Sequence, residues 1–466
     1  MNPRHFALLA VLSPLAACGP SVQETPGEET SPCNDGLCLE GLECRSDLCV
    51  DPDWEPTTGA STSGPAPDTD DSGTTDPPTP SEPTDEVDIL VVMDNSGSMG
   101  EEQANLSSGV SGLVQPLVDA GMSVRVAITT TDSGNYWCKG AGVSDPESGQ
   151  FVLSSCLGRL DEFYFSGNDT NAETACTDYC TLNGIQIQPT TTAEDATPAA
   201  RPWIEAGPEG TNLGNGTSVA DALHCALPQG INGCGFESPL ESMSRALQLT
   251  GDTNQDEFGF LRSSAHLAVV FVTDEADCSF NPAHQEIVFG EEGVGNQAFW
   301  SLPEVQQSPS SAVCWNAGVE CDFGLPTDQC VSADKNVEGG ATADASDAAL
   351  FPVQQYRSQL EALRTQKLAF GADVFTFAIT GVHEGYSGSM TYALGPNGSD
   401  PESFQARFGI GEGCTSVATE AVPPVRIREL AEGSAWGDNG KLYSVCATDY
   451  GPAIADIVGT IVDYTP

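Results

Sequence analysis

Positive charge is scarce in this 466-residue chain, which has 16 lysines and arginines against 67 aspartates and glutamates. The resulting formal net charge of −51 excludes nucleic acid as a partner, because phosphate backbones are bound by clustered cations. It also disfavours direct contact with anionic lipid. The acidity itself is typical of a soluble surface and does not identify a ligand.

Enzyme motifs are also lacking. The five histidines are scattered, and His383-Glu384 is not part of an HExxH zinc motif. No Gly-Lys-Ser/Thr phosphate-binding loop is present, and residues 385–388 (GYSG) lack the glycine spacing of a hydrolase nucleophile elbow. After the N-terminal residues, no segment is long and apolar enough for a transmembrane helix. We therefore expect a protein that binds rather than catalyses.

The N-terminus predicts export. Arg4 precedes an apolar stretch from Phe6 to Leu15, which is too short to span a bilayer, so residues 1–17 are predicted to be a signal peptide. The following Leu15-Ala16-Ala17-Cys18 resembles the lipobox of bacterial lipoproteins. That resemblance implies a lipid on Cys18, and Gly19 resembles the next residue of lipoproteins sent to the outer membrane. We expect the protein at the bacterial outer membrane or cell surface, held to the membrane by this anchor only.

Cysteine usage agrees with an oxidising compartment. Seventeen cysteines less Cys18 leave sixteen, an even number that we expect to form disulfides. Cys225 with Cys234 and Cys414 with Cys446 are plausible pairs, although spacing does not fix the connectivity. The sixteen are Cys33, Cys38, Cys44, Cys49, Cys138, Cys156, Cys176, Cys180, Cys225, Cys234, Cys278, Cys314, Cys321, Cys330, Cys414 and Cys446.

The chain before residue 87 divides by composition. A linker, 18–32, leads to a small cysteine-rich module, 33–50, too short for a core and held by two disulfides, with zinc as the alternative. Residues 51–86, rich in Pro, Thr and Ser, are predicted to be a disordered stalk. If extended, the stalk reaches roughly 100 Å, at about 3 Å per residue.

Residues 87–466 are predicted to form one α/β domain. Buried strands are expected at Ile89–Met93, 122–131, 266–273, 374–380 and 441–446. Between and after them, apolar residues recur at helical spacing near 106–117, 240–247, 356–363 and 454–462, with Pro116 predicted to end or kink the first helix. This alternation predicts a doubly wound, mostly parallel sheet with helices on both faces. Two cysteine-bearing insertions lie near 133–216 and 280–348.

A polar turn follows the first strand. In Asp94-Asn95-Ser96-Gly97-Ser98, one carboxylate and two hydroxyls alternate on a tight turn and are able to face one hard cation. The alternative is an ordinary serine-rich turn in which Asp94 caps the next helix. This DxSxS motif after a strand resembles the metal-ion-dependent adhesion site of von Willebrand factor type A domains.

That resemblance implies a ligand set for Mg²⁺ or Ca²⁺. Ser96 and Ser98 bind the metal directly, whereas Asp94 and Asp274, which ends the strand at 266–273, bind through water. Glu275 and Asp277 are expected to add negative charge at the rim.

The third ligand is where the sequence departs from the family, which has a threonine there. By distance from the next helix, Glu237 occupies that place, and Thr217 in Gly216-Thr217 is the alternative. A directly bound glutamate partly neutralises the cation, which weakens its pull on a partner's carboxylate.

The resemblance implies a surface lipoprotein that binds a divalent cation and, through it, a protein or another acidic ligand. The alternative is a structural or scaffolding lipoprotein whose metal only stabilises the fold. Both insertions follow strands that end at the metal edge, so we expect them to wall the site and select the partner.

Overall fold

The computed structural model describes residues 84–464, except 140–142, 166–169, 291–294, 324–328, 418 and 434–435, and the backbone of 43–45 and 48–50. The chain divides into two units, 1–77 and 78–466. In the first, β1 (Glu43–Arg45) pairs antiparallel with β2 (Leu48–Val50), which sets Cys44 opposite Cys49. The predicted signal peptide, Cys18, Cys33, Cys38 and the stalk as far as residue 83 lie outside the described residues.

A seven-stranded sheet forms the centre of the second unit. Its order is β15-β12-β9-β3-β4-β7-β8. The first five strands are parallel to one another, β7 is antiparallel to β4, and β8 is antiparallel to β7. The strands are β3 (Glu86–Met93), β4 (Ser123–Thr130), β7 (Ile204–Gly207), β8 (Gly210–Thr211), β9 (His266–Val272), β12 (Val374–Thr380) and β15 (Gly440–Ser444). The predicted mostly parallel sheet is therefore confirmed.

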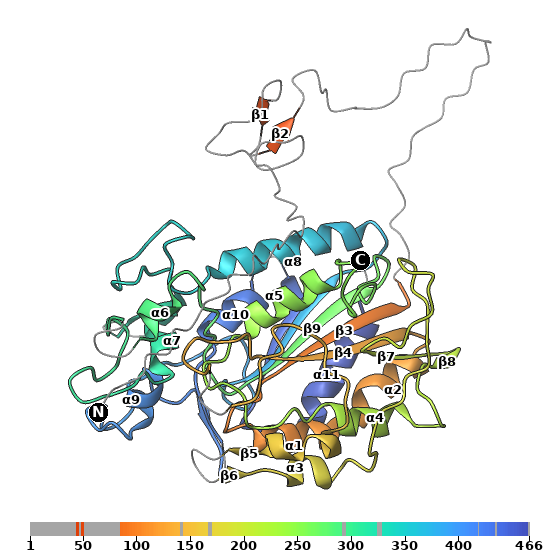
Figure 1. The fold of residues 1–466 in the computed structure, drawn as a ribbon, viewed down its shortest axis with the longest axis horizontal. Helices are drawn as coiled ribbons and strands as arrows, with labels where there is room; N and C mark the ends of the chain where they lie inside the picture. The colour runs from red at the N-terminus through yellow and green to blue at the C-terminus, as the bar shows by residue number, and fades with distance from the viewer. Residues whose placement is uncertain are drawn as a thin grey trace, which may run out of the picture. The chain divides into compact units, whose positions relative to one another are not determined.

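Helices cover both faces of this sheet, so its central strands are buried on both sides (Figure 1). One face packs against α1 (Gly100–Gly109), α2 (Ser111–Asp119), α4 (Val219–Ala226) and α11 (Gly451–Val462). The other packs against α5 (Pro239–Leu249), α8 (Val353–Leu368) and α10 (Val425–Ala431). Full burial explains why β9 and β12 read as continuous apolar runs rather than alternating patterns. Within the described part of the chain, no helix has the length and apolar character needed to cross a bilayer.

The prediction that the first helix ends at Pro116 is wrong. The helix divides at Val110 instead, and α2 continues through Pro116 to Asp119. A proline inside a helix removes one backbone hydrogen bond. Here Leu113, Val114 and Leu117 are buried in the core beneath the sheet, and this packing outweighs the missing bond.

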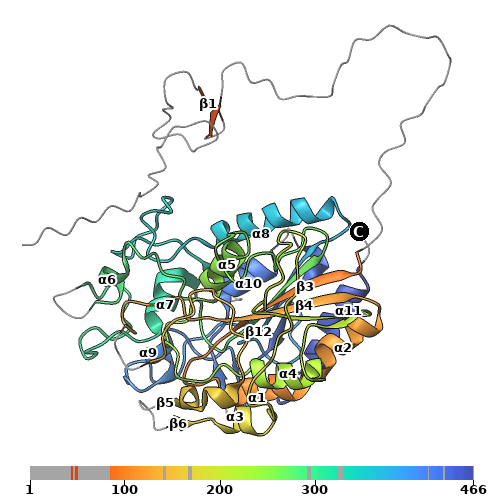
Figure 2. The ribbon, with the colours of Figure 1, turned by 45° about the vertical axis from the view of Figure 1, so that its right-hand side comes forward.

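Three long connections carry the short elements. The first insertion holds η1 (Cys156–Gly158), η2 (Leu160–Phe163), β5 (Tyr164–Phe165), β6 (Thr170–Asn171), α3 (Thr174–Thr177), β7 and β8. The second holds α6 (Gln285–Val288), α7 (Ala312–Gly318), β10 (Val319–Asp322) and β11 (Gln329–Ser332). A third, which the sequence analysis did not single out, joins β12 to α10 and holds α9 (Phe404–Phe408), β13 (Cys414–Thr415) and β14 (Glu420–Ala421); η3 (Gly437–Asn439) precedes β15. Figures 1 and 2 both show α6, α7 and α9 grouped beyond one end of the sheet.

Twelve of the predicted disulfide cysteines are paired in the described residues. The bonds are Cys138–Cys234, Cys156–Cys176, Cys180–Cys225, Cys278–Cys314, Cys321–Cys330 and Cys414–Cys446. The expected Cys414–Cys446 pair is confirmed, and the expected Cys225–Cys234 pair is wrong. The reason is that Cys225 packs with Cys156 and Phe163 in one small core, whereas Cys234 packs with Phe236 and Phe280 in another.

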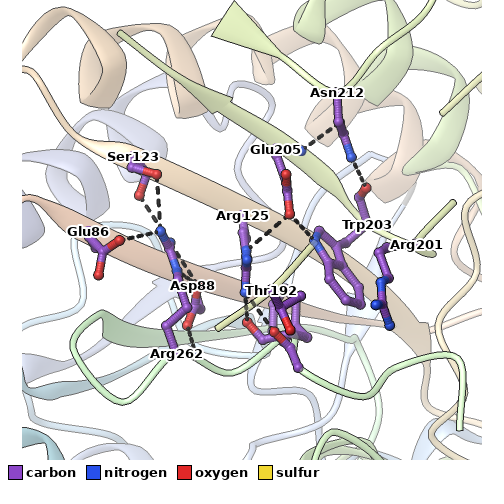
Figure 3. A network of polar contacts seen from close by, with 12 residues as sticks. Glu86, Asp88, Ser123, Arg125, Thr192, Arg201, Trp203, Glu205, Asn212 and Arg262 are labelled. Carbon is purple, nitrogen blue, oxygen red and sulfur yellow. Dashed lines mark hydrogen bonds and ion pairs between the residues drawn. The ribbon is translucent and has the colours of Figure 1, made fainter. Parts of the chain in front are cut away.

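Buried charges are neutralised at the amino ends of the parallel strands (Figure 3). Asp88 of β3 is fully buried, and its carboxylate lies 2.8 Å from the guanidinium of Arg262. The same guanidinium donates to Glu86 and to the hydroxyl of Ser123, each at 3.0 Å. Arg125 of β4 donates at 2.7 Å to the carbonyl of Gly259. This edge is therefore tied together by arginines.

Figure 3 also shows how β7 joins this network. Glu205 lies 3.3 Å from the guanidinium of Arg125 and accepts at 2.9 Å from the indole of Trp203. The guanidinium groups of Arg125 and Arg201 both lie over the Trp203 ring, 5.5 and 5.8 Å from its centroid. These contacts fix the antiparallel edge of the sheet.

We predict that Arg262→Met lowers the free energy of unfolding by about 3–5 kcal/mol, because it removes the direct ion-pair partner of the buried Asp88 carboxylate. Urea unfolding of the oxidised protein measures this loss. Lys441→Met is the control, since its pair with Asp456 is substantially exposed and is expected to contribute at most about 1 kcal/mol. Equal losses in the two variants would contradict the prediction.

Candidate metal centre

The strand order creates a crevice at the carboxyl ends of β3 and β9. From β3 the chain continues to β4 and β7 on one side, and from β9 it continues to β12 and β15 on the other. Crossovers that leave two adjacent strands in opposite directions open a gap there, which is where doubly wound sheets bind ligands. Asp94 follows β3 and Asp274 follows β9, so both lie at this switch point.

The turn after β3 is held by the carboxylate of Asp94. One Asp94 oxygen accepts from the backbone N–H of Ser96 at 2.8 Å, and the other accepts from the hydroxyl of Thr273 at 2.6 Å. The hydroxyls of Ser96 and Ser98 lie 3.4 Å apart. Helix α1 begins only at Gly100 and has no side-chain cap. The helix-cap interpretation of Asp94 is therefore wrong, because this side chain organises the turn instead.

Glu237 lies in the loop that leads into α5 and is fully buried. One of its carboxylate oxygens accepts from the hydroxyl of Thr131, and the other, Oε1, has no hydrogen-bond partner. Burial raises the pKa of Glu237 well above its usual value, and the charges of Asp94, Asp132 and Glu275 raise it further. Glu237 is thus near enough to Asp94 for their charges to interact.

The same loop is fixed from both sides. Ser238 donates to the carbonyl of Thr131 at 2.9 Å, and Cys278 donates to the carbonyl of Glu237 at 2.6 Å. The disulfide between Cys138 and Cys234 ties the start of the loop to the connection after β4. Glu237 is consequently held between the ends of β4 and β9.

Asp274 is only 3% exposed, and its Oδ1 atom has no hydrogen-bond partner. Burial raises the pKa of this carboxyl well above its usual value, and the charges of Asp94, Glu102 and Glu275 add to the rise, whereas a hydrogen bond from Ser98 lowers it. The charged neighbours that shift the pKa of Asp274 are all carboxylates. Asp274 therefore lies in a strongly electronegative environment.

Two further acidic groups belong to this cluster. Burial raises the pKa of Glu275 to about 8, with the charge of Asp94 as the next cause. Burial likewise raises the pKa of Glu102, on α1, to about 7; its Oε1 accepts from the Thr419 hydroxyl and its Oε2 has no partner. Sequence reasoning missed Glu102, because only its place on a helix facing the crevice identifies it.

Contrary to the expectation, Asp277 does not add negative charge at the rim of the site. Its carboxylate lies 2.8 Å from the guanidinium of Arg426, and both side chains are buried. It also accepts from the backbone N–H of Leu240 at 3.2 Å. Asp277 therefore joins α5 to α10 as an internal ion pair, and it leaves no charge at the surface.

The structure does not bring Thr217 to Asp94. Thr217 precedes the first turn of α4, and its N–H bonds to the carbonyl of Gly214. The segment that follows the C-terminal end of α4 reaches the crevice instead. There Gln103 accepts from the N–H of Gly230 and donates to the carbonyl of Asp94 at 2.9 Å. Glu237, and not Thr217, accompanies Asp94.

The donor set fits a hard divalent cation. Glu237, Asp274 and Glu102 each have a buried oxygen without a hydrogen-bond partner, and Ser96 and Ser98 supply two neighbouring hydroxyls. Oxygen ligands are what Mg²⁺ and Ca²⁺ prefer. In the described residues, one set of three acidic, histidine or cysteine side chains has its ligand atoms within 4.8 Å of one another: Cys156, Cys176 and Cys180, all disulfide-bonded. The carboxylates at the crevice are more widely spaced, so a cation there needs hydroxyl and water ligands too.

A cavity of about 300 Å³ opens onto this cluster. Ser98, Asp274 and Glu275 line it from the ends of β3 and β9, and residues of α9 and of the β13–β14 hairpin form the rest of its wall. Both predicted insertions reach the same edge. Phe165 lies against Gly97, and Ser311 donates to the carbonyl of Gly235 at 3.0 Å. Their role in selecting a partner stays a prediction, and the third connection supplies most of the cavity wall.

Comparison with known proteins does not establish a family. No protein-family model matches the chain, and no curated protein matches it. Among solved structures, the chain is similar to the open conformation of the pilus adhesin SpaC from Lactobacillus rhamnosus GG, with 10% identity and a TM-score of 0.31. The match covers 82% of this chain and 31% of the adhesin, so the chain spans about a third of that protein. A likeness at this level carries neither a family nor a function.

Proposed function

We propose that the second unit is a cation-dependent binding domain. The observation that carries this proposal is the pair of buried, unpartnered carboxylate oxygens, Glu237 Oε1 and Asp274 Oδ1, beside the hydroxyls of Ser96 and Ser98. A buried acceptor without a donor is costly, and a bound cation removes that cost. Ser96, Ser98 and Glu237 would hold Mg²⁺ or Ca²⁺ directly, with Asp94 and Asp274 acting through water.

The bound cation would supply a positive centre that attracts an oxygen from a partner protein. Ser98 is exposed and lines the open cavity, whereas Asp94 and Glu237 are buried behind it. This order, from buried carboxylates to an exposed hydroxyl, suits a cation with one side turned to solvent. A protein ligand that presents a carboxylate is the partner we propose, with adhesion or envelope assembly as the role.

A purely structural metal is the second candidate. Glu237, Glu275 and Glu102 bring more negative charge to the cation than a site with two aspartates and a threonine. That excess favours a cation that is neutralised within the fold. The two candidates differ in whether the metal-loaded protein binds a carboxylate.

We also propose that Cys18 carries a lipid that holds the protein at the bacterial outer membrane or cell surface. The support is the sequence Leu15-Ala16-Ala17-Cys18 after an apolar stretch. The acidic domain would then be presented at a distance from the membrane by the segment 51–86.

We predict that Mg²⁺ or Ca²⁺ stabilises the protein more at pH 8 than at pH 5. Burial raises the pKa values of Glu102 and Glu275 from 4.5 to about 7 and about 8, so the cation-free fold favours their protonated forms. Its stability therefore falls as the pH rises from 4.5 towards these values. A cation that replaces the protons restores it, by about 2.7 kcal/mol at a hundred times its dissociation constant. Thermal unfolding at both pH values, with and without cation, measures this; equal shifts would contradict it.

We predict that Asp94→Ala abolishes cation binding measured by calorimetry, because the turn loses the carboxylate that orients Ser96. Glu237→Thr is expected to weaken cation binding at least tenfold, since it removes one negative ligand, and to strengthen capture of an acidic partner. Thr217→Ala is the control and leaves the affinity unchanged. Unchanged affinity in Glu237→Thr, with a loss in Thr217→Ala, would transfer the third position to Thr217.

We predict that Cys18→Ser moves the protein from the membrane fraction to the soluble fraction, because the substitution removes the atom that would carry the lipid. Fractionation of cells that express each form measures this. Membrane association that persists in Cys18→Ser would rule out the lipid anchor while leaving the cation site untouched.

A further inference from the structure

The cavity above the candidate metal centre has one basic residue in its wall. On the sheet side it is lined by Ser98, Asp274 and Glu275, and among the residues that line it Arg407 of α9 is the one with a positive charge. Arg407 comes from the third connection, more than a hundred residues after Asp274 in the chain. The fold thus places a guanidinium in the wall of the cavity that Asp274 and Glu275 also line.

The guanidinium of Arg407 has one long ion pair and one aromatic contact. Its ion pair with Glu420 is long, at 3.7 Å, and the two side chains are 46% and 56% exposed. Such a pair contributes little, since water screens both charges. The guanidinium also lies over the ring of Phe408, 5.0 Å from the centroid, which orients its plane while leaving N–H donors free for a ligand.

The wall that carries Arg407 is anchored to the rest of the domain. Ser403 caps α9 by accepting from the N–H of Ala406, and Gly409 ends the helix with a φ of +85°. A side chain at Gly409 would meet Trp315 of α7. The neighbouring hairpin is tied to the end of β15 by the Cys414–Cys446 disulfide. Arg407 is therefore presented from a fixed position.

Arg407 lines the same cavity as Asp274 and Glu275, at the candidate metal centre. A positive group in this cavity matters because Glu237 stands where the resembled family has a neutral threonine. A cation that is bound by Glu237 as well as by Asp94 and Asp274 has less positive charge left for a ligand. A second positive group across the cavity compensates for that loss.

We propose that Arg407 is a specificity-determining residue that binds the ligand's carboxylate from the side opposite the cation. The inference rests on the proposed function, and it defines the ligand as an acidic side chain of a protein segment. Arginine pairs with a carboxylate through two parallel N–H donors, which a single cation does not provide. A ligand with a neutral amide in place of the carboxylate loses this pair.

The cavity also indicates what flanks the acidic residue. Phe404, Phe408 and Val417 line it beside Arg407, and Val417 is fully exposed. These side chains give the pocket an apolar wall, so an apolar residue next to the acidic one is expected to pack there. The preferred segment is an acidic residue followed or preceded by an aliphatic one.

The test uses the full-length protein loaded with Ca²⁺ or Mg²⁺ and two blocked dipeptides, N-acetyl-Glu-Leu-amide and N-acetyl-Gln-Leu-amide. Ligand-observed NMR titration measures their affinities, and calorimetry measures the metal alone. Arg407→Gln is expected to weaken binding of the Glu dipeptide about tenfold, as the loss of a charge-assisted hydrogen bond predicts. The affinity for the metal is expected to stay unchanged.

Lys441→Gln is the matched control, because it removes one positive charge from a half-exposed pair at β15 and should leave dipeptide binding unchanged. Equal affinity of wild type and Arg407→Gln for the Glu dipeptide, with metal binding intact, would overturn the role of Arg407. No preference of the metal-loaded wild type for Glu over Gln would overturn it as well. A wild-type protein that binds no metal would instead refute the proposed function, and this inference with it.

Discussion

Crowding of buried carboxylates at the carboxyl ends of β3 and β9 is the constraint on which this domain depends. Asp94, Glu237 and Asp274 are nearly or completely buried, and burial raises the pKa of each. Neutral threonine hydroxyls from separate segments donate hydrogen bonds to these carboxylates and to Glu102. Thr273 donates to Asp94, Thr131 donates to Glu237, and Thr419 donates to Glu102. A hydroxyl satisfies one lone pair without cancelling the charge. The cluster is therefore oriented by threonines and receives no counter-charge from them.

Disulfides hold the loops that bear these charges. Cys138–Cys234 joins the connection after β4 to the loop of Glu237, Cys278–Cys314 joins the segment after β9 to α7, and Cys414–Cys446 joins the β13–β14 hairpin to the end of β15. All three lie at the edge where like charges repel. Loops of this length have a large conformational entropy when free, and covalent links reduce it in the unfolded chain. The oxidised chain is thus able to keep this edge ordered without an internal counter-charge.

The parts of the site that the sequence predicted are those that local patterns specify. An apolar run followed by Asp94-Asn95-Ser96 identifies a strand and its turn, and the same reasoning located Asp274. Glu237 was reached through its distance from the next helix. The missed groups depend on contacts between distant segments: Thr419 bonds to Glu102 across 317 positions, and Asp88 bonds to Arg262 across 174. The pairing of Cys225 was wrong for the same reason, because a separation of nine positions does not reveal that Cys225 and Cys234 pack in separate cores.

The buried carboxylates at the amino ends of the parallel strands have basic partners, whereas those at the carboxyl ends that form the candidate metal centre do not. This contrast bears on the proposed function. At the amino end of β3, burial raises the pKa of Asp88, and the positive charges of Arg262, Lys367 and Arg125 lower it. About 20 Å along the same strand, at roughly 3.3 Å per residue, Asp94 has no basic group among the causes of its pKa shift. With 16 basic residues in the chain, cations are few, and among the residues that line the cavity at the candidate metal centre Arg407 is the one with a positive charge. A buried arginine beside Asp94 would neutralise the crevice permanently. Because no basic group is among the causes of the pKa shift of Asp94, the crevice is not neutralised permanently there, as the proposed reversible cation site requires.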